Sequence, residues 1–222
     1  MLGNRQSIIY CNVINGKIAI AAKPGEPGAT AYVNKQGDTK YYFFHDFVEG
    51  KIARIVKKGP PPNHPEFAET WNVTIVDNGE TYNLQLYVGG KLARAFFCTL
   101  PNVDASQIVR YEPKMKTYEG KPDTSLMVIQ NGEALKWAYT NDDPGRRPPV
   151  EVTTLKSGKK VIDTTEQDDF FGQEAEAFNK TVHNVNEDTK QPENKPAESD
   201  ERPDVDAMPP YEDDLPFDDL PF

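Results

Sequence analysis

Three dipeptides constrain the fold of the first hundred residues more than any other feature of the chain. Asn15-Gly16, Glu49-Gly50 and Asn78-Gly79 each stand between two runs rich in apolar residues. Asn-Gly in particular fits the two-residue turn between antiparallel strands, because both residues tolerate a positive φ. In the third unit, "TWNVTIVDNGETYNLQLYV", apolar and polar residues alternate on both sides of the turn, as they do in half-buried strands. The sequence therefore predicts a series of β-hairpins.

The pattern changes after Gly89-Gly90. In "KLARAFFCTLP" the large apolar residues recur at helical spacing until Pro101, which predicts a short helix; a strand through Phe96–Cys98 is the alternative. Beyond it, "SQIVRYEP" and "TSLMVIQ" are predicted strands separated by a basic loop, and "LKWAYT" is a possible further strand after Asn131-Gly132.

Hairpins, a short helix and two further strands follow one another in the order typical of an OB-fold. We therefore predict a mainly all-β domain, an OB-fold-like five-stranded barrel with one short helix. A different small barrel or a β-sandwich would share most of these sequence signals.

The charge of the chain is divided unevenly. Net charge is −10 over 222 residues, but residues 163–222 hold 19 Asp and Glu against 4 Lys and Arg. Residues 1–162 hold 16 acidic and 21 basic side chains. A basic domain suits a polyanion, and an acidic extension can imitate one.

The acidic region has few large apolar residues. "TTEQDDFFGQEAEAF" could form a short helix, whereas the Pro-containing polar stretch that follows is typical of disorder. The expected organisation is therefore a domain over residues 1–162, a disordered acidic linker over 163–212 and a terminal segment over 213–222.

No enzyme signature is present: the chain has no phosphate-binding glycine loop, nucleophile elbow or HExxH motif. Asp142-Asp143 and Asp168-Asp169 could hold Mg²⁺ in a nuclease, but such pairs more often solvate loops. Cys11 and Cys98 lie far apart without a Cys or His cluster, so no metal, cofactor or catalytic residue is expected. Without a signal peptide or an apolar membrane span, we expect a soluble protein of the cytoplasm, in a bacterium or in the host of a phage.

Binding signals are stronger than catalytic ones. Residues 1–162 interleave 17 aromatic side chains with their 21 basic ones, the combination that holds single-stranded nucleic acid through phosphate contacts and base stacking. In "KYYFFHDFVEGKIARIVKK" both faces of the first strand are aromatic. One face could pack in the core while the other binds bases, although protein could also cover both faces. The residues predicted to bind DNA in this stretch are Lys40, Tyr42, Phe44, Arg54, Lys57 and Lys58.

Two further groups complete the predicted DNA site. Tyr87 follows Asn83 and Gln85 on the polar face of its strand, and Trp71 stands where a strand opens, in the core or at its rim. The basic connection between the last two strands alternates rings with charges, and OB-folds bind oligonucleotides with that loop. Its predicted contacts are Arg110, Tyr111, Lys114, Lys116, Tyr118 and Lys121.

The chain ends "DDLPFDDLPF", an acidic, apolar-tipped pentapeptide written twice. Solvation explains its aspartates but not its four exposed apolar side chains, whereas a flexible peptide captured through its terminal carboxylate is a known recognition mode. The residues predicted to bind a partner are Asp213, Asp214, Leu215, Pro216, Phe217, Asp218, Asp219, Leu220, Pro221 and Phe222.

A basic aromatic-rich domain, an acidic linker and a terminal Asp-Asp-Leu-Pro-Phe together resemble the bacterial and phage single-stranded DNA-binding proteins. The resemblance rests on this layout and on the tip. It implies that Asp218–Phe222 bind replication, recombination and repair proteins, with Phe222 in an apolar pocket and its carboxylate on a basic residue. The internal copy, which lacks a free carboxylate, departs from the usual single tip.

Two functions follow from these patterns. The first is a sequence-tolerant protein that coats single-stranded DNA and recruits partner proteins through its tip. The alternative is an acidic-tailed interaction protein, a nucleic-acid mimic or replication-factor docking protein, that binds no DNA itself.

Overall fold

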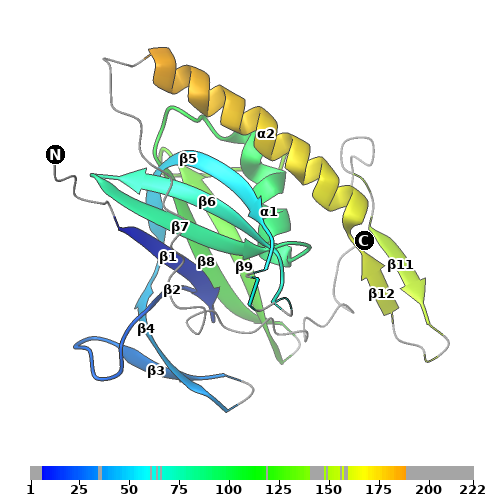
Figure 1. The fold of residues 1–222 in the computed structure, drawn as a ribbon. Helices are drawn as coiled ribbons and strands as arrows, with labels where there is room; N and C mark the ends of the chain where they lie inside the picture. The colour runs from blue at the N-terminus through cyan, green and yellow to red at the C-terminus, as the bar shows by residue number, and fades with distance from the viewer. Residues whose placement is uncertain are drawn as a thin grey trace.

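The computed structural model describes residues 7–34, 37–60, 62–63, 65, 67–118, 120–140, 148, 150–155, 157 and 160–188. Strands predominate in this part of the chain (Figure 1), which confirms the mainly β prediction. The expected helix over "KLARAFFCT" is also confirmed and is α1 (Lys91–Thr99).

Ten strands form one mixed sheet, in the order β10-β9-β8-β5-β6-β7-β1-β2-β4-β3. Their bounds are β1 Ile8–Ile14, β2 Lys17–Ala21, β3 Thr30–Val33, β4 Thr39–His45, β5 Val48–Lys58, β6 Thr70–Asp77, β7 Glu80–Tyr87, β8 Val109–Tyr118, β9 Lys121–Gln130 and β10 Glu133–Ala134. A separate two-stranded sheet joins β11 (Glu151–Thr154) to β12 (Lys160–Asp163). The described strands close no barrel and exceed the five that were predicted.

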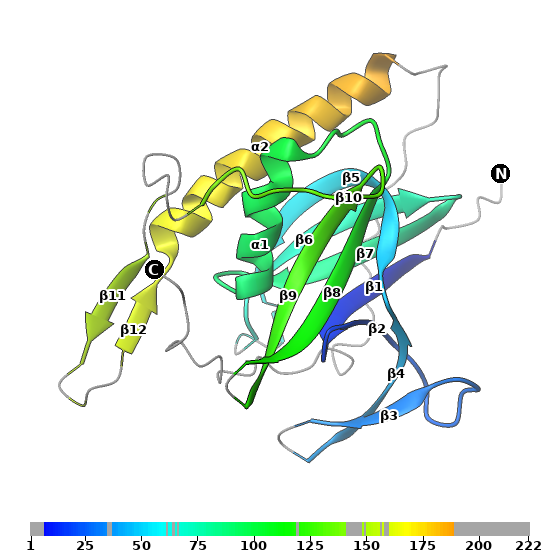
Figure 2. The ribbon, with the colours of Figure 1, turned by 180° about the vertical axis from the view of Figure 1, so that it is seen from behind.

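The sheet nevertheless curls into two layers. Figure 1 looks onto the layer formed by β5, β6, β7 and β1, which we call the front layer; Figure 2 looks from behind onto β8 and β9, with α1 beside them. Strand β5 belongs to both layers, because Val48–Gly50 pair with β8 and Lys51–Lys58 pair with β6. A register shift between Ile52 and Arg54 marks the corner, as expected where a bulge bends a strand.

The layers also approach each other where the β1–β2 turn meets β8. A Cβ on Gly16 would lie 2.5 Å from the backbone nitrogen of Met115, so only glycine fits there. Strand β1 reaches this position by pairing in parallel with β7, with Tyr10 opposite Asn83. No local pattern in the sequence predicts that long-range parallel contact.

Two of the three predicted hairpins are confirmed. Asn15 and Asn78 have positive φ angles of 49° and 45° and begin the turns of β1–β2 and β6–β7. Glu49-Gly50 is not a turn, however, because β5 runs through it and β4 pairs with β2 and β3 instead. Gly50 serves close packing: a Cβ there would lie 2.6 Å from the carbonyl oxygen of Val76.

The region predicted as a basic loop is mostly strand. Strands β8 and β9 pair along their full lengths, from Val109 opposite Gln130 to Tyr118 opposite Lys121. The segment "LKWAYT" forms no strand, although Leu135 N donates a hydrogen bond to Val128 O. Between α1 and β8, a single 3-10 turn spans Leu100–Asn102.

The main core lies between the two layers and is closed at one side by α1. Its fully buried members include Val73 and Leu84 from the front layer, Tyr111 from β8 and the α1 side chains Phe96 and Phe97. Burying these rings supplies much of the stabilisation available to a small domain.

Helix α2 (Thr165–Asp188) is part of the same folded unit. Phe171 stacks on Phe97 with ring centroids 4.7 Å apart, and Phe178 and Val182 are buried further along the helix. The boundary expected at residue 162 therefore lies inside the fold, and residues 165–188 of the predicted linker are helical. The sequence predicts only a short helix here, because acidic residues interrupt the apolar ones along this stretch.

Including α2 changes the charge of the domain. Residues 1–188 contain 24 acidic and 22 basic side chains, a balance of −2 in place of the +5 of residues 1–162. Attraction for a polyanion must therefore come from local patches and not from net charge. No helix within the described ranges is long and apolar enough to cross a membrane.

Candidate nucleic-acid interface

The outward side of the front layer carries polar side chains in register. Along β6 and β7 the core residues Val73, Ile75, Leu84 and Leu86 alternate with polar ones on the other side of the sheet. Of these polar residues, Thr70, Asn72 and Asn83 are themselves buried, whereas Thr74, Gln85 and Tyr87 are partly exposed. We call this surface the amide face; it comprises Tyr10, Arg54, Lys58, Thr70, Asn72, Thr74, Asn83, Gln85 and Tyr87.

One lateral row crosses four adjacent strands of the amide face. Arg54 pairs with Thr74, Thr74 with Asn83 and Asn83 with Tyr10. Neighbouring strands lie about 4.8 Å apart, so a cation, a hydroxyl, an amide and an aromatic ring follow one another over roughly 14 Å. A second row brings Lys58 across Thr70 to Tyr87.

Two amide side chains of this face, Asn72 and Asn83, are largely buried. Thr70 Oγ1 donates to Asn72 Oδ1 at 3.2 Å, which orients that side chain. Asn83 is 8% exposed, and its Oδ1 accepts no hydrogen bond from the described part of the chain. Buried acceptors usually have a donor, but this oxygen is covered by protein, so a ligand reaches it only if the side chain or its neighbours move.

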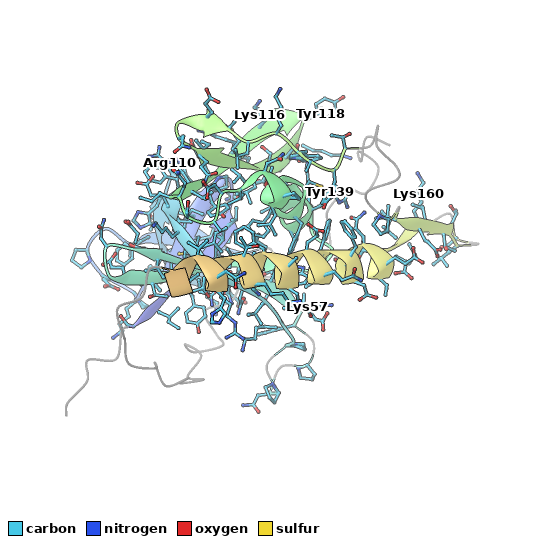
Figure 3. The ribbon with its side chains drawn as sticks, turned by 90° about the horizontal axis from the view of Figure 1, so that it is seen from above. Lys57, Arg110, Lys116, Tyr118, Tyr139 and Lys160 are labelled. Atoms are coloured by element: carbon cyan, nitrogen blue, oxygen red, sulfur yellow. The ribbon has the colours of Figure 1, made fainter. Side chains whose placement is uncertain are left out.

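A second charged surface lies on the outward side of β8 and β9. Val109, Tyr111 and Pro113 point into the core and are buried, so the residues between them face outward. We call this the hairpin face; its basic and aromatic members are Arg110, Lys114, Lys116, Tyr118 and Lys121. Figure 3 shows Arg110, Lys116 and Tyr118 together on one side of α2.

Ion pairs moderate the charge at the base of the hairpin face. Arg110 Nε donates to Glu49 Oε2 at 2.8 Å, and its guanidinium lies 4.0 Å from the ring centroid of Phe47. Lys114 pairs with Glu112. Hydrogen bonding to Lys17, with smaller contributions from charges that include Lys114, lowers the pKa of Asp46. Tyr118 at the tip is 60% exposed.

The predicted DNA contacts therefore separate into groups. Arg54, Lys58 and Tyr87 come together on the amide face, whereas the predicted contacts from 110 to 121, apart from Tyr111, belong to the hairpin face on the other layer. Lys57 lies on neither: it points to the opposite side of β5, pairs with Glu69 at 2.9 Å, and appears across α2 from Lys116 (Figure 3).

Trp71 and Tyr111 are core residues and not stacking platforms. Trp71 is 2% exposed and lies edge-on to Phe97, while Tyr111 is fully buried beside Phe96. Complete burial also raises the pKa of Tyr111. The prediction that these rings contact bases is wrong, because they occupy the inward positions of β6 and β8.

The aromatic strand around residue 42 has a separate role. Tyr42 is buried in a small second cluster with Ile14 and Ala19, and its ring packs against Tyr32 and Phe44. Desolvation, with a smaller contribution from Tyr32, raises its pKa. Tyr42 thus anchors the β3–β4 arm (Figure 1) and is not available to bases, whereas Lys40 and Phe44 are half-buried beside it.

Sequence reasoning missed Tyr10, Asn72 and Thr74 as members of the same surface. The alternation in "TWNVTIVD" contains the signal for the two β6 residues, because Asn72 and Thr74 occupy the positions between core residues. Tyr10 could not be placed, since its position depends on the parallel pairing of β1 with β7.

One of the two acidic pairs lies among the described residues, and its first member has a structural role. Asp168, from one of the acidic pairs, accepts hydrogen bonds from Thr164 Oγ1 at 2.7 Å and Gly89 N at 3.3 Å and so joins α2 to the β7–α1 turn. Within the described ranges no group of three or more His, Cys, Asp or Glu side chains could hold a metal ion. Asp142-Asp143 and the tip residues 213–222 lie outside the described residues.

Comparisons with known proteins give no further assignment: no protein-family model, curated protein or solved structure matches this chain.

Proposed function

We propose that this chain is a sequence-tolerant single-stranded DNA-binding protein that recruits replication, recombination or repair proteins through its C-terminal tip. The observation that carries the proposal is the row Arg54–Thr74–Asn83–Tyr10 across four neighbouring strands. These groups follow one another at the spacing of β-strands. The cation suits a phosphate, the polar groups suit a base edge and the ring suits the plane of a base in an extended DNA strand.

The chemistry of the amide face favours binding to DNA of any sequence over recognition of a particular sequence. Stacking on Tyr10 or Tyr87 accepts every base, because all four have an aromatic plane. An Asn or Gln side chain both donates and accepts hydrogen bonds, so it can meet the edge of any base after an amide flip. Arg54 and Lys58 would neutralise phosphates.

An OB-like organisation is proposed for the unit from β5 to β9. Within it three consecutive strands precede α1 and two strands follow, which is the order of elements that the sequence suggested. The OB-fold is a partly open barrel whose sheet binds oligonucleotides. The N-terminal strands β1 to β4 would be additions that extend its binding sheet.

The alternative function, an acidic interaction protein without DNA binding, is favoured by the charge balance of −2 over residues 1–188. A domain without net positive charge attracts DNA only at short range and only where cations cluster. The two proposals therefore differ in whether the amide face binds single strands.

Substitutions on the amide face and on the opposite side of β5 distinguish them. In the full chain, Arg54→Ala and Tyr87→Ala should weaken binding of oligo-dT by roughly 1–3 kcal/mol each, the range for a lost stacked base or a charged contact. Lys57→Ala, a matched loss of charge on the opposite side, should leave affinity unchanged. Equal effects at all three positions, or none, would refute the placement of the site.

A further inference from the structure

A cavity of about 630 Å³ opens where β5 turns from the front layer to β8. Across three strands, Glu49 pairs with Arg110, and Arg110 pairs with Ile129. Lys51 follows on the outward row of β5, and the segment before β8 contributes Gln107 and Ile108. This volume lies within the range of ligand pockets, about 300–1,000 Å³. The cavity lies between the amide face and the hairpin face.

One wall of the cavity is held rigid before any ligand arrives. The buried side chain of Gln130 bonds both backbone groups of Asp104, with Oε1 accepting from N and Nε2 donating to O, each at 3.0 Å. Asp104 Oδ1 in turn accepts from Ser106 N and Ser106 Oγ. The 104–108 segment therefore presents Gln107 and Ile108 from a fixed backbone, as pre-organised binding sites do.

The cations of the cavity retain capacity for an anion. A guanidinium has five N–H donors, and in the described part of the chain Arg110 commits Nε and Nη2 to the single oxygen Glu49 Oε2. Phe47 beneath it fixes the plane of the group at 4.0 Å. Ile108 is 52% exposed and Ile129 is half-buried, so an apolar surface lies beside these donors.

We propose that this cavity binds one nucleotide of a single DNA strand that passes along β5 from the amide face to the hairpin face. The base lies against Ile108 and Ile129, with Gln107 or Asn131 at its edge, and its phosphate lies between Lys51 and Arg110. This assignment rests on the proposed function. It predicts that the DNA strand follows β5 around the bend of the sheet and so contacts both the amide face and the hairpin face.

The acidic residues nearby favour a nucleotide that belongs to an already bound DNA strand over a free nucleotide. Glu49 already neutralises part of Arg110, and Lys51 contributes, after hydrogen bonds from Ser106, to the lowered pKa of Asp104. A free mononucleotide would gain little from so balanced a site. A nucleotide delivered by a strand bound on the amide face benefits from its high effective concentration.

The test uses the full chain carrying Lys51→Ala together with Ile108→Ala. Both side chains are exposed, and neither contributes to the core. The matched control is Lys160→Ala with Val161→Ala, an exposed cation and aliphatic residue on β12. Affinity is measured by fluorescence anisotropy for oligo-dT of increasing length, from about 4 to about 16 nucleotides, the span of OB-fold site sizes, and for dTMP.

We expect the cavity variant to bind the shortest oligonucleotides like wild type and to lose at least about fivefold in affinity for the longest, on the scale of one lost base contact. The control should match wild type at every length, and dTMP should bind weakly to all three proteins. An equal loss at every length, no loss at any length, or tight dTMP binding abolished by the cavity substitutions would overturn the assignment.

These outcomes separate the cavity from the broader proposal. If wild type binds oligo-dT and Arg54→Ala weakens it while the cavity variant does not, the cavity assignment fails and DNA binding stands. If wild type binds no oligo-dT of any length, both fail.

Discussion

Asn179 of α2 binds both backbone groups of Ile55 in β5. Asn179 Oδ1 accepts from Ile55 N at 2.8 Å, and Asn179 Nδ2 donates to Ile55 O at 2.7 Å. Among the described strands, β8 pairs with the first residues of β5, up to Gly50, and no other described strand lies beside Ile55 on that edge. One side-chain amide therefore replaces a neighbouring strand and fixes α2 against the sheet.

Asn179→Ala should lower the free energy of unfolding by about 1–3 kcal/mol, because it leaves a buried N–H and C=O without partners. Urea denaturation followed by circular dichroism measures this loss. Asn184→Ala, an exposed change on the same helix, has the same effect on helix propensity and serves as control. If both variants were equally stable, the Asn179 bonds would contribute nothing.

Truncation tests whether α2 belongs to the domain. A chain ending at residue 162 loses the buried side chains Phe171, Phe178 and Val182, which together supply roughly 5 kcal/mol or more. We expect residues 1–188 to unfold cooperatively and residues 1–162 to show weak cooperativity and bind a hydrophobic dye. Equal stability of the two fragments would show that α2 is dispensable.

Gly50 offers a test of the corner in β5. Gly50→Ala forces a Cβ to within 2.6 Å of a backbone oxygen, and overpacking of this kind costs about 1–3 kcal/mol. Gly120→Ala also places alanine at a positive φ, of 80°, but in open space. Thermal unfolding should show a larger loss for Gly50→Ala, and a smaller loss there than at Gly120 would contradict the close packing.

Much of the β structure could be predicted from short-range signals. Asn15-Gly16 and Asn78-Gly79 define their turns locally, and alternation separates the faces of β6 and β7. The turn predicted at Glu49-Gly50 is wrong. The sequence does not distinguish a glycine that allows two strands to approach closely from a glycine in a turn.

The candidate site could not be predicted as a whole, because its residues come together through long-range strand pairings that no local sequence pattern indicates. Tyr87 was correctly placed on a polar face, but its neighbours Arg54 and Tyr10 reach it through long-range pairings. For Trp71, which the sequence places in the core or at its rim, and for Tyr42, the sequence pattern does not show whether an aromatic ring near basic residues points into the core or outward.

The C-terminal tip allows a test of partner binding that spares the domain. Deleting Phe222 removes an apolar ring and moves the terminal carboxylate without changing the aspartates. We expect association with a replication partner to fall sharply in pull-down assays, as capture of a terminal carboxylate and its apolar anchor requires. DNA affinity should be unchanged. If deletion of 213–222 abolishes partner binding but deletion of Phe222 does not, the internal copy or the acidic charge is the recognised feature.

Salt-dependent titration of the full chain with oligo-dT tests whether the amide face binds single-stranded DNA. Each phosphate neutralised on a single strand contributes a slope of about −0.7 to log K against log salt concentration. We predict measurable affinity at low salt, a steep loss as salt rises, and a shallower slope for Arg54→Ala combined with Lys58→Ala than for wild type. Absence of binding at low salt, or an affinity independent of salt and of these two residues, would rule out binding of single-stranded DNA by the amide face.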